Sequence, residues 1–152
     1  VLEEDAEQYF EMNGVDSPYM LLVNQVNKSR CNDLPSDYHD RDLKDKLYFV
    51  RSDIPSITHL DFSARVQTVS KETNRRYHRL IEQFKGLTGY GLVINTSFNV
   101  RGEPIVNSPE DAYRCFMRTE MDYLVLENFL LGKQEQPAWE KDDAWQDEFE
   151  LD

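Results

Sequence analysis

Alternating side-chain character over residues 58–67 constrains the fold of this chain more than any other stretch. One set of alternate positions is mainly apolar and the other is polar, namely Thr58, Leu60, Phe62, Ala64 and Val66 against His59, Asp61, Ser63, Arg65 and Gln67. A period of two indicates a β-strand with opposed faces. The stretch therefore predicts a sheet with one face in the core and the other lined by hydrogen-bonding groups.

The polar face of this strand has two interpretations. One is the solvated side of an antiparallel sheet, because such sheets commonly expose one face to water. The other is the wall of a ligand-binding crevice, since the polar row includes His59, Asp61 and Arg65 but neither lysine nor glutamate. The residues alone leave both interpretations open.

Helical patterns accompany the strand. Apolar residues recur at three- and four-residue steps over 73–87, which is typical of a helix packed on a sheet, with His78 on its solvated face. Ser108-Pro109 followed by two acidic residues predicts the start of another helix that ends near Glu120. Residues 2–10 predict a helix with one apolar side, formed by Leu2, Ala6, Tyr9 and Phe10.

Compact apolar runs predict further strands at 19–23, 90–94 and 122–126, with a shorter one at 47–50. We expect the first of these strands to be central in a sheet. The polar residues 27–46 contain no periodic apolar set, so they predict a surface loop. Together these elements predict an α/β domain.

A polar loop follows the predicted strand at 90–94. Its candidate binding side chains are Asn95, Thr96, Ser97, Asn99 and Arg101. Hydroxyl and amide groups donate hydrogen bonds, and a planar guanidinium pairs with phosphate or carboxylate through two of them. At the end of an interior strand, such a loop would lie in the crevice where α/β sheets bind ligands. It is a candidate anion site, although the same residue types also satisfy backbone groups in ordinary turns.

Composition limits the partners. A net charge of -12 argues against nucleic acid, whose binding depends on lysine and arginine, and half of that charge lies in 133–152, with eight acidic residues against two lysines. No apolar run approaches the roughly 20 residues of a membrane helix. Cys31 and Cys115 lack metal-ligand spacing, which favours a reducing cytoplasm. We expect a cytoplasmic protein without a protein-held metal.

Several ordered motifs resemble those of one enzyme family. Residues 95–112, together with 1–4, 17–20 and 58–69, closely resemble the C-terminal region of carbamoyltransferases of the nodulation-protein and antibiotic-biosynthesis type, the NodU/CmcH family. The resemblance covers residues 1–133 and implies a YrdC-like fold, with a twisted mixed sheet and flanking helices. Residues 134–152 then form an acidic tail.

The resemblance implies an enzyme that uses carbamoyl phosphate, ATP and Mg²⁺. It implies that this domain forms carbamoyl adenylate, and that an N-terminal actin-like ATPase-fold domain of the same full-length protein passes the carbamoyl group to an acceptor hydroxyl. In the family a basic segment precedes the position of Val1 and contributes to the carbamoyl phosphate site. We therefore expect the present fragment to be truncated and inactive alone.

Candidate site residues follow from the same resemblance. Arg65 and Arg101 are the expected catalytic groups, because fixed cations stabilise charge that develops on phosphorus and on departing pyrophosphate. The expected substrate-binding residues are the Ser-x-Asn pair, its neighbours and two family-matched positions: Ser97, Asn99, Thr96, Asn95, His59 and Asp61.

Two other functions stay open from the sequence. One is a non-catalytic module of the same fold that binds a nucleotide or a partner. The other is an interaction domain whose acidic tail, with Trp139, Trp145 and Phe149, recruits another protein. A homodimer is also compatible with the sequence.

Overall fold

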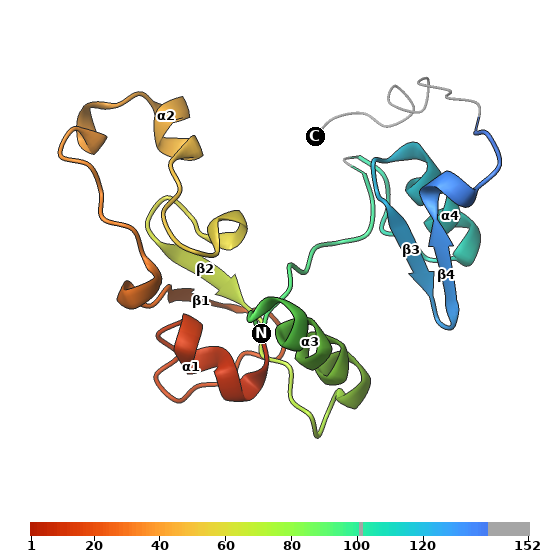
Figure 1. The fold of residues 1–152 in the computed structure, drawn as a ribbon, viewed down its shortest axis with the longest axis horizontal. Helices are drawn as coiled ribbons and strands as arrows, with labels where there is room; N and C mark the ends of the chain where they lie inside the picture. Colours follow the sequence, from red (N-terminus) through yellow and green to blue (C-terminus); the bar gives the residue numbers. More distant parts are fainter. Residues whose placement is uncertain (101, 140–152) are drawn as a thin grey trace. The chain divides into compact units, whose positions relative to one another are not determined.

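The computed structural model describes residues 1–100 and 102–139. The chain divides into an N-terminal unit, Val1–Ile94, and a C-terminal unit, Asn95–Asp152 (Figure 1). The N-terminal unit contains α1 (Ala6–Tyr9), β1 (Leu22–Gln25), α2 (Leu43–Tyr48), β2 (Ser63–Val66) and α3 (Arg75–Thr88). The described part of the C-terminal unit contains α4 (Pro109–Arg118), β3 (Tyr123–Leu126) and β4 (Phe129–Gly132). Short 3₁₀ turns lie at Glu3–Asp5, Lys28–Arg30, Tyr38–Asp40, Pro55–Ile57 and Lys133–Glu135.

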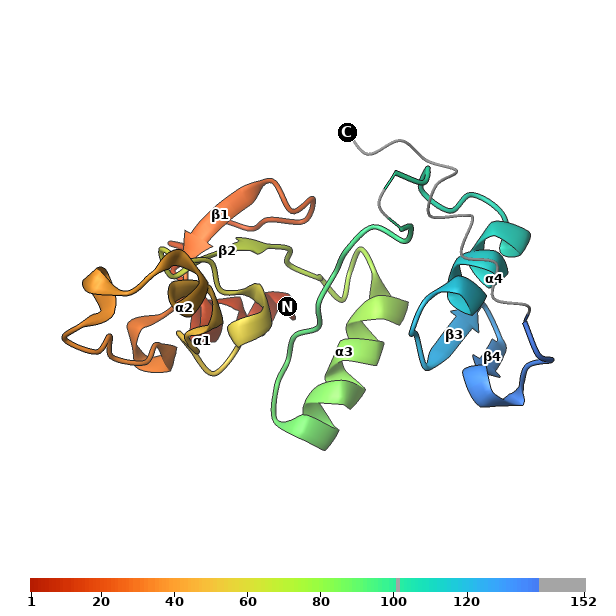
Figure 2. The same ribbon diagram turned by 90° about the horizontal axis from the view of Figure 1, so that it is seen from above.

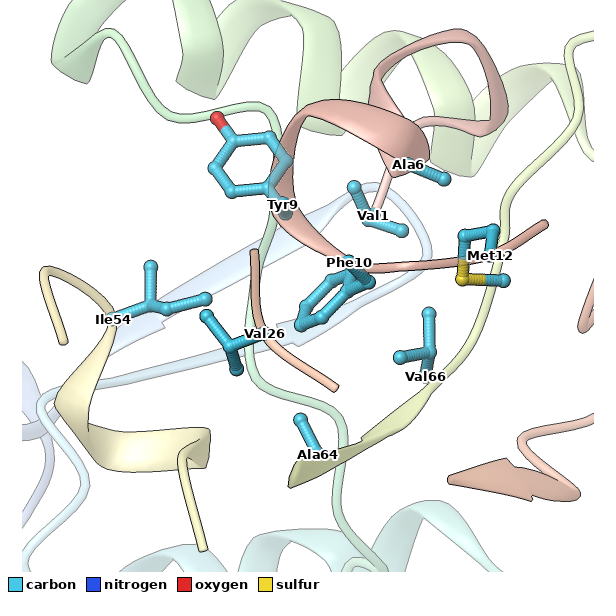
Figure 3. Close-up of a cluster of buried hydrophobic side chains, with 9 residues drawn as sticks. All are labelled: Val1, Ala6, Tyr9, Phe10, Met12, Val26, Ile54, Ala64 and Val66. Carbon is cyan, nitrogen blue, oxygen red and sulfur yellow. The ribbon is translucent and has the colours of Figure 1, made fainter. Parts of the chain in front are cut away.

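The main core of the N-terminal unit gathers around Phe10 (Figure 3). Residues from the first helical turns, from β2 and from the intervening loops supply it: Val1, Ala6, Tyr9, Met12, Val26, Ile54, Ala64 and Val66. The predicted N-terminal helix is present as a 3₁₀ turn that continues into α1. All four residues predicted for its apolar side are buried, which confirms that assignment.

β1 and β2 pair as antiparallel strands, with Leu22 opposite Val66 and Gln25 opposite Ser63. The predicted alternation holds from Ala64 to Val66, because Ala64 and Val66 are buried while Arg65 is exposed. It fails on either side of the turn, since Ser63 of the polar set is buried and Leu60 of the apolar set is exposed. The strand is shorter than predicted. Residues before Ser63 form a turn in which the Phe62 amide donates to the His59 carbonyl oxygen at 3.1 Å, and Phe62 adopts φ +63°.

The strand expected at 19–23 is displaced and is not central. Met20 adopts φ +56°, which breaks the extended conformation, and β1 begins only at Leu22. The sheet has two strands, and the side chains of Tyr19 and Leu21 are about 80% exposed. The apolar run could not predict the position of the strand in the sheet, because it carries no information on which strands pair with it.

Residues 27–50 also differ from the prediction. The stretch is largely at the surface, as expected, but it forms short helices, and the ring of Tyr38 is buried against Phe49 at 5.4 Å between centroids. The strand predicted at 47–50 is wrong. α2 ends at Tyr48 and so includes the first two of these four residues. The Asp42 side chain caps the start of that helix by accepting from the Asp45 amide at 2.8 Å.

The strand predicted at 90–94 does not form a ladder with any described residue. The segment instead runs beside the N-terminus, where the Leu2 amide donates to the Gly91 carbonyl oxygen at 2.9 Å. The Gly91 amide donates to Tyr9 Oη, also at 2.9 Å. Leu92 and Val93 still pack against the two cores of this unit, so the burial expected of an apolar run is partly met.

α3 matches the predicted helix closely. Asn74 caps its start, and Gly89 ends it in the left-handed conformation at φ +83°. Ile81 is fully buried, but His78 is also buried, with only 3% of its surface exposed. Its Nε2 lies 2.9 Å from Glu4 Oε1. The prediction of a solvated His78 is therefore wrong, because the N-terminal turn covers this side of the helix.

In the C-terminal unit, α4 lies against the antiparallel β3–β4 hairpin (Figure 2). Ser108 and Asp111 form the predicted helix start as a reciprocal capping box, with Pro109 at the first helical position. Phe116 and Cys115 are fully buried, so Cys115 is a packing residue. Lys133 Nζ donates to the carbonyl oxygens of Thr119, at 2.8 Å, and of Phe116.

Helices and small antiparallel sheets together are consistent with the predicted α/β class. Within residues 1–100 and 102–139, no helix combines the length and the apolar character that crossing a membrane requires.

The first residues of the tail pack on α4: Trp139 meets the Tyr113 ring edge-on at 6.2 Å, and Tyr113 Oη donates to Gln136 Oε1 at 3.2 Å. Trp145 and Phe149 lie outside the described residues.

Candidate functional site

His59 and Asp61 meet through a third side chain, that of Ser63. Ser63 Oγ donates to Asp61 Oδ1 at 2.6 Å and lies 2.9 Å from His59 Nδ1. The Ser63 amide also donates to Asp61 Oδ1, at 3.1 Å, and the His59 amide donates to the Ser63 carbonyl oxygen at 2.8 Å. The turn before β2 therefore exists as a hydrogen-bonded unit, with His59 and Asp61 exposed and Ser63 buried.

Asp61 is held in its ionised form by this turn. The hydrogen bond from the Ser63 hydroxyl, followed by that from the Ser63 amide, lowers the pKa of the Asp61 carboxyl group below its ordinary value. Asp61 is therefore an acceptor at neutral pH, and its Oδ1 accepts two hydrogen bonds from Ser63.

Arg65 follows on the same face of β2, two residues after Ser63. Its side chain is exposed, and Nη2 donates to the Met20 carbonyl oxygen at 3.2 Å. Its cross-strand partner is Val23. The guanidinium is thus displayed at the surface of the N-terminal unit, and a planar guanidinium in that position can pair with a phosphate or carboxylate.

Asn99 organises the polar loop of the C-terminal unit. Its Nδ2 donates to the carbonyl oxygens of Val100, at 3.2 Å, and Glu103, at 2.7 Å. The Glu103 amide closes a turn onto the Val100 carbonyl oxygen at 3.1 Å, and Gly102 supplies the required positive φ of 83°. Both amide hydrogens of Asn99 are used within the loop, and its Oδ1 has no hydrogen-bond partner among residues 1–100 and 102–139.

Asn95, Thr96 and Ser97 are exposed at the start of the same loop. Among residues 1–100 and 102–139, the hydroxyl groups of Thr96 and Ser97 have no hydrogen-bond partner. They are therefore available as donors to a ligand. Arg101, the second predicted arginine, lies outside the described residues.

The structure brings some of the predicted site residues together. His59 and Asp61 form one cluster, whereas Ser97 and Asn99 belong to the C-terminal unit. The convergence of Arg65 with Ser97 and Asn99 stays a prediction. Sequence reasoning missed Ser63, although the polar residue at every second position from His59 to Ser63 was visible.

Other chemistry is limited by the described side chains. No group of three His, Cys, Asp or Glu residues could hold a metal within the parts of the chain that the structure describes. Burial raises the pKa of both thiols, with nearby acidic groups adding to the effect at Cys31. Both cysteines are therefore thiols at neutral pH, the form that is a poor nucleophile.

Comparison with known proteins identifies the family. Residues 1–133 match the model of the carbamoyltransferase C-terminus. An uncharacterised protein from Synechocystis is 57% identical over 152 residues, which are all of this chain and 25% of that protein. The nodulation protein NolNO of Sinorhizobium fredii is 36% identical over 135 residues, or 88% of this chain and 17% of that protein.

A third relative has an enzymatic name. The 3'-hydroxymethylcephem-O-carbamoyltransferase of Amycolatopsis lactamdurans is 41% identical over 88 residues, which are 54% of this chain and 17% of that protein. The chain thus spans a quarter or less of the length of these three relatives. The match over residues 1–133 shows that this chain belongs to the carbamoyltransferase C-terminus family.

Proposed function

We propose that this chain is the part of an O-carbamoyltransferase that binds carbamoyl phosphate and ATP and forms carbamoyl adenylate. Another domain of the same protein then transfers the carbamoyl group to an acceptor hydroxyl. The observation that carries the proposal is the family match over residues 1–133, supported by a relative that is named as an O-carbamoyltransferase. A YrdC-like arrangement of the sheet in the whole protein is part of the same proposal.

The overall reaction balances with one water molecule. Carbamoyl phosphate, ATP and water give carbamoyl adenylate, phosphate and pyrophosphate. Negative charge develops on the phosphoryl oxygens during each step, so catalysis depends on cations and donors that are already in place. No covalent nucleophile is needed, which agrees with the raised pKa values of both cysteines.

The exposed side chains of both units bind the phosphates and stabilise the developing negative charge in different ways. Arg65 pairs with a phosphate through its guanidinium, and Arg101 supplies a second positive charge. The hydroxyls of Thr96 and Ser97, which have no hydrogen-bond partner among residues 1–100 and 102–139, donate to phosphate oxygens. The amide hydrogens of Asn99 hold the turn of the loop that presents Ser97. Its role in substrate binding stays a prediction.

Mg²⁺ would be held mainly by the phosphates of ATP. The described residues offer no cluster of acidic side chains that could form a protein cage for it. Mg²⁺ commonly keeps several waters and binds through substrate phosphates, so this donor set fits a metal that arrives with the nucleotide.

Calorimetric titration with carbamoyl phosphate, and separately with ATP and Mg²⁺, tests the proposal. We expect Arg65→Ala and Ser97→Ala to weaken binding of at least one ligand by about 1–3 kcal/mol, as for a lost hydrogen bond to a charged group. The matched controls are Arg41→Ala, whose guanidinium pairs with Asp37, and Ser56→Ala in the exposed Pro55–Ile57 turn. Equal affinity in all four variants would reject the assignment of both residues.

A non-catalytic module of the same fold is the competing function. The complete protein would then bind both ligands but release no pyrophosphate. A pyrophosphate-release assay with carbamoyl phosphate, ATP and Mg²⁺ therefore distinguishes it from the enzyme.

A further inference from the structure

The Asp61–Ser63–His59 cluster fixes where the protons lie. A serine hydroxyl carries one hydrogen, and in this turn the hydroxyl of Ser63 donates it to Asp61 Oδ1 at 2.6 Å. The 2.9 Å contact between Ser63 Oγ and His59 Nδ1 then needs its hydrogen from the imidazole. His59 must therefore carry a proton on Nδ1.

A neutral imidazole has one N–H and one lone pair. With the proton on Nδ1, Nε2 of a neutral His59 is an acceptor. The His59 side chain is exposed, whereas Ser63, which orients it, has 2% of its surface exposed. His59 Nε2 is therefore a hydrogen-bond acceptor at the surface, and the buried side chain of Ser63 fixes its orientation.

The backbone around the cluster makes the support rigid. The Ser63 amide donates to the Asp61 carboxylate, the Ser63 carbonyl oxygen accepts from the His59 amide, and the Phe62 amide closes the turn onto His59. Ser63 also opens β2 and pairs with Gln25. A change of the imidazole tautomer would break the hydrogen bond from His59 Nδ1 to Ser63 Oγ, or would require the Ser63 hydroxyl to turn away from Asp61.

We propose that Ser63, anchored by Asp61, is a positioning residue that holds His59 in the Nδ1–H tautomer, so that His59 Nε2 accepts a hydrogen bond from an N–H group of the ligand. Asp61 acts through Ser63 and does not contact the ligand. The identity of the ligand rests on the proposed function. Within it, two ligands carry N–H donors: carbamoyl phosphate, through its amide, and ATP, through the adenine amino group. We assign the carbamoyl amide, and binding of carbamoyl phosphate in the absence of ATP tests this assignment.

This geometry predicts specificity. Carbamoyl phosphate carries an NH₂ group where acetyl phosphate carries a methyl group. An acceptor at Nε2 favours the first, whereas an N–H at that position would not. His59 would thus select the acyl group, while arginine and hydroxyl groups bind the phosphate.

The first experiment reads the tautomer without any ligand. Long-range ¹H–¹⁵N correlation spectra of the chain, recorded about two pH units above the ordinary imidazole pKa, distinguish the two ring nitrogens. Three histidines are present, and His59→Gln identifies the signals of His59. We expect the Nδ1–H pattern in the unmodified chain, a mixture of tautomers in Ser63→Ala, and recovery in Ser63→Thr, which keeps the hydroxyl.

The unmodified chain decides this test even where Ser63→Ala does not fold. An Nε2–H pattern for His59 would overturn the inference, whatever the chain binds. Backbone amide spectra of Ser56→Ala and Ser63→Ala show whether a change at His59 is local.

The second experiment compares carbamoyl phosphate with acetyl phosphate. We expect His59→Ala to weaken binding of carbamoyl phosphate by about 2- to 10-fold, as for one neutral hydrogen bond, and to leave acetyl phosphate unchanged. The Nε2 signal of His59 should shift with carbamoyl phosphate alone. Equal binding of both compounds, insensitive to His59, overturns the inference and leaves the proposed function standing. Binding of neither compound by the full-length protein counts against the proposed function and removes the ligand assignment with it.

Discussion

Lys85 Nζ lies 2.6 Å from Asp5 Oδ2 and 2.8 Å from Asp5 Oδ1, which ties the end of α3 to the N-terminal turn. The Asp5 side chain is 4% exposed and that of Lys85 is 40% exposed, so a buried carboxylate meets an ammonium group at the surface. Gln8 Nε2 adds a hydrogen bond to Asp5 Oδ1 at 3.0 Å. A buried carboxylate is costly unless it is paired, and Lys85 supplies the pairing charge for Asp5.

Replacing Lys85 with methionine should lower the melting temperature at pH 7, because Asp5 would keep its burial and lose its partner. Arg79→Met, at an exposed position of the same helix, is the matched control and should change stability little. The hydrogen bond to Asp5 raises the pKa of Lys85 above its ordinary value of 10.5. This stabilisation is fully present below about pH 10.5 and is lost as the pH rises through the folded-state value. The difference between the variant and the unmodified chain should therefore shrink at high pH.

Gly91→Ala should destabilise the N-terminal unit by about 1–3 kcal/mol, the range for overpacking a filled site. A Cβ at this position would lie 2.3 Å from Asp5 Oδ2. Gly86→Ala is the control, because a Cβ at that position meets nothing within 4 Å. Gly86 lies inside α3, where alanine is a better helix former than glycine, so this variant should not lose stability. Urea denaturation of both variants measures the contrast. Equal stabilities would show that the Gly91 backbone does not approach Asp5 as described.

Ser108→Ala should cost about 1 kcal/mol, as for a lost helix N-cap. The Ser108 hydroxyl accepts from the Asp111 amide at 3.1 Å and donates to Asp111 Oδ2 at 2.7 Å. That side-chain hydrogen bond is the main cause of the lowered pKa of Asp111. The associated stability is present above the ordinary value of 3.8 and is lost as the pH falls through the folded-state pKa. Denaturation at pH 7 and pH 2.5 should show a larger effect of Ser108→Ala at pH 7; a pH-independent difference would contradict this linkage.

Asn99→Ala and Ser97→Ala should separate stability from binding. Asn99→Ala removes two hydrogen bonds to backbone carbonyls, so we expect a loss of about 1–2 kcal/mol in the stability of the C-terminal unit. Ser97→Ala removes an exposed hydroxyl that has no partner in the part of the chain that the structure describes, and it should leave the thermal midpoint unchanged. Thermal denaturation combined with ligand titration gives both readings. A stability loss in Ser97→Ala would mean that its hydroxyl has a structural role.

The signals that predicted structure correctly were local. Ser108, Pro109 and Asp111 are adjacent in sequence and build a cap by themselves, and Gly89 ends α3 through its own backbone conformation. His78 and the run at 19–23 were misassigned because their surroundings come from distant residues. Glu4, which covers His78, lies 74 residues away in the sequence. β1 pairs with β2, which is also distant in the sequence.

The same distinction applies to the site. The exposure of Thr96 and Ser97 followed from a polar loop, but the use of Asn99 to hold the turn depends on where the carbonyl oxygens of Val100 and Glu103 point. Ser63 was placed on the polar face but was not predicted as a site residue, because a serine in an alternating strand cannot be told from any other polar position. Only the distances to His59 and Asp61 reveal its role.

Lys133 contacts both the end of α4 and the base of the β3–β4 hairpin. Its ammonium group binds the last carbonyl oxygens of α4, while its own amide donates to the Asp122 carbonyl oxygen at 2.8 Å, next to the first residue of β3. Fraying of the helix end and opening of the hairpin base therefore break the same residue's contacts. The two regions should exchange their amide hydrogens as a single cooperative segment, with matched protection at Thr119 and Lys133.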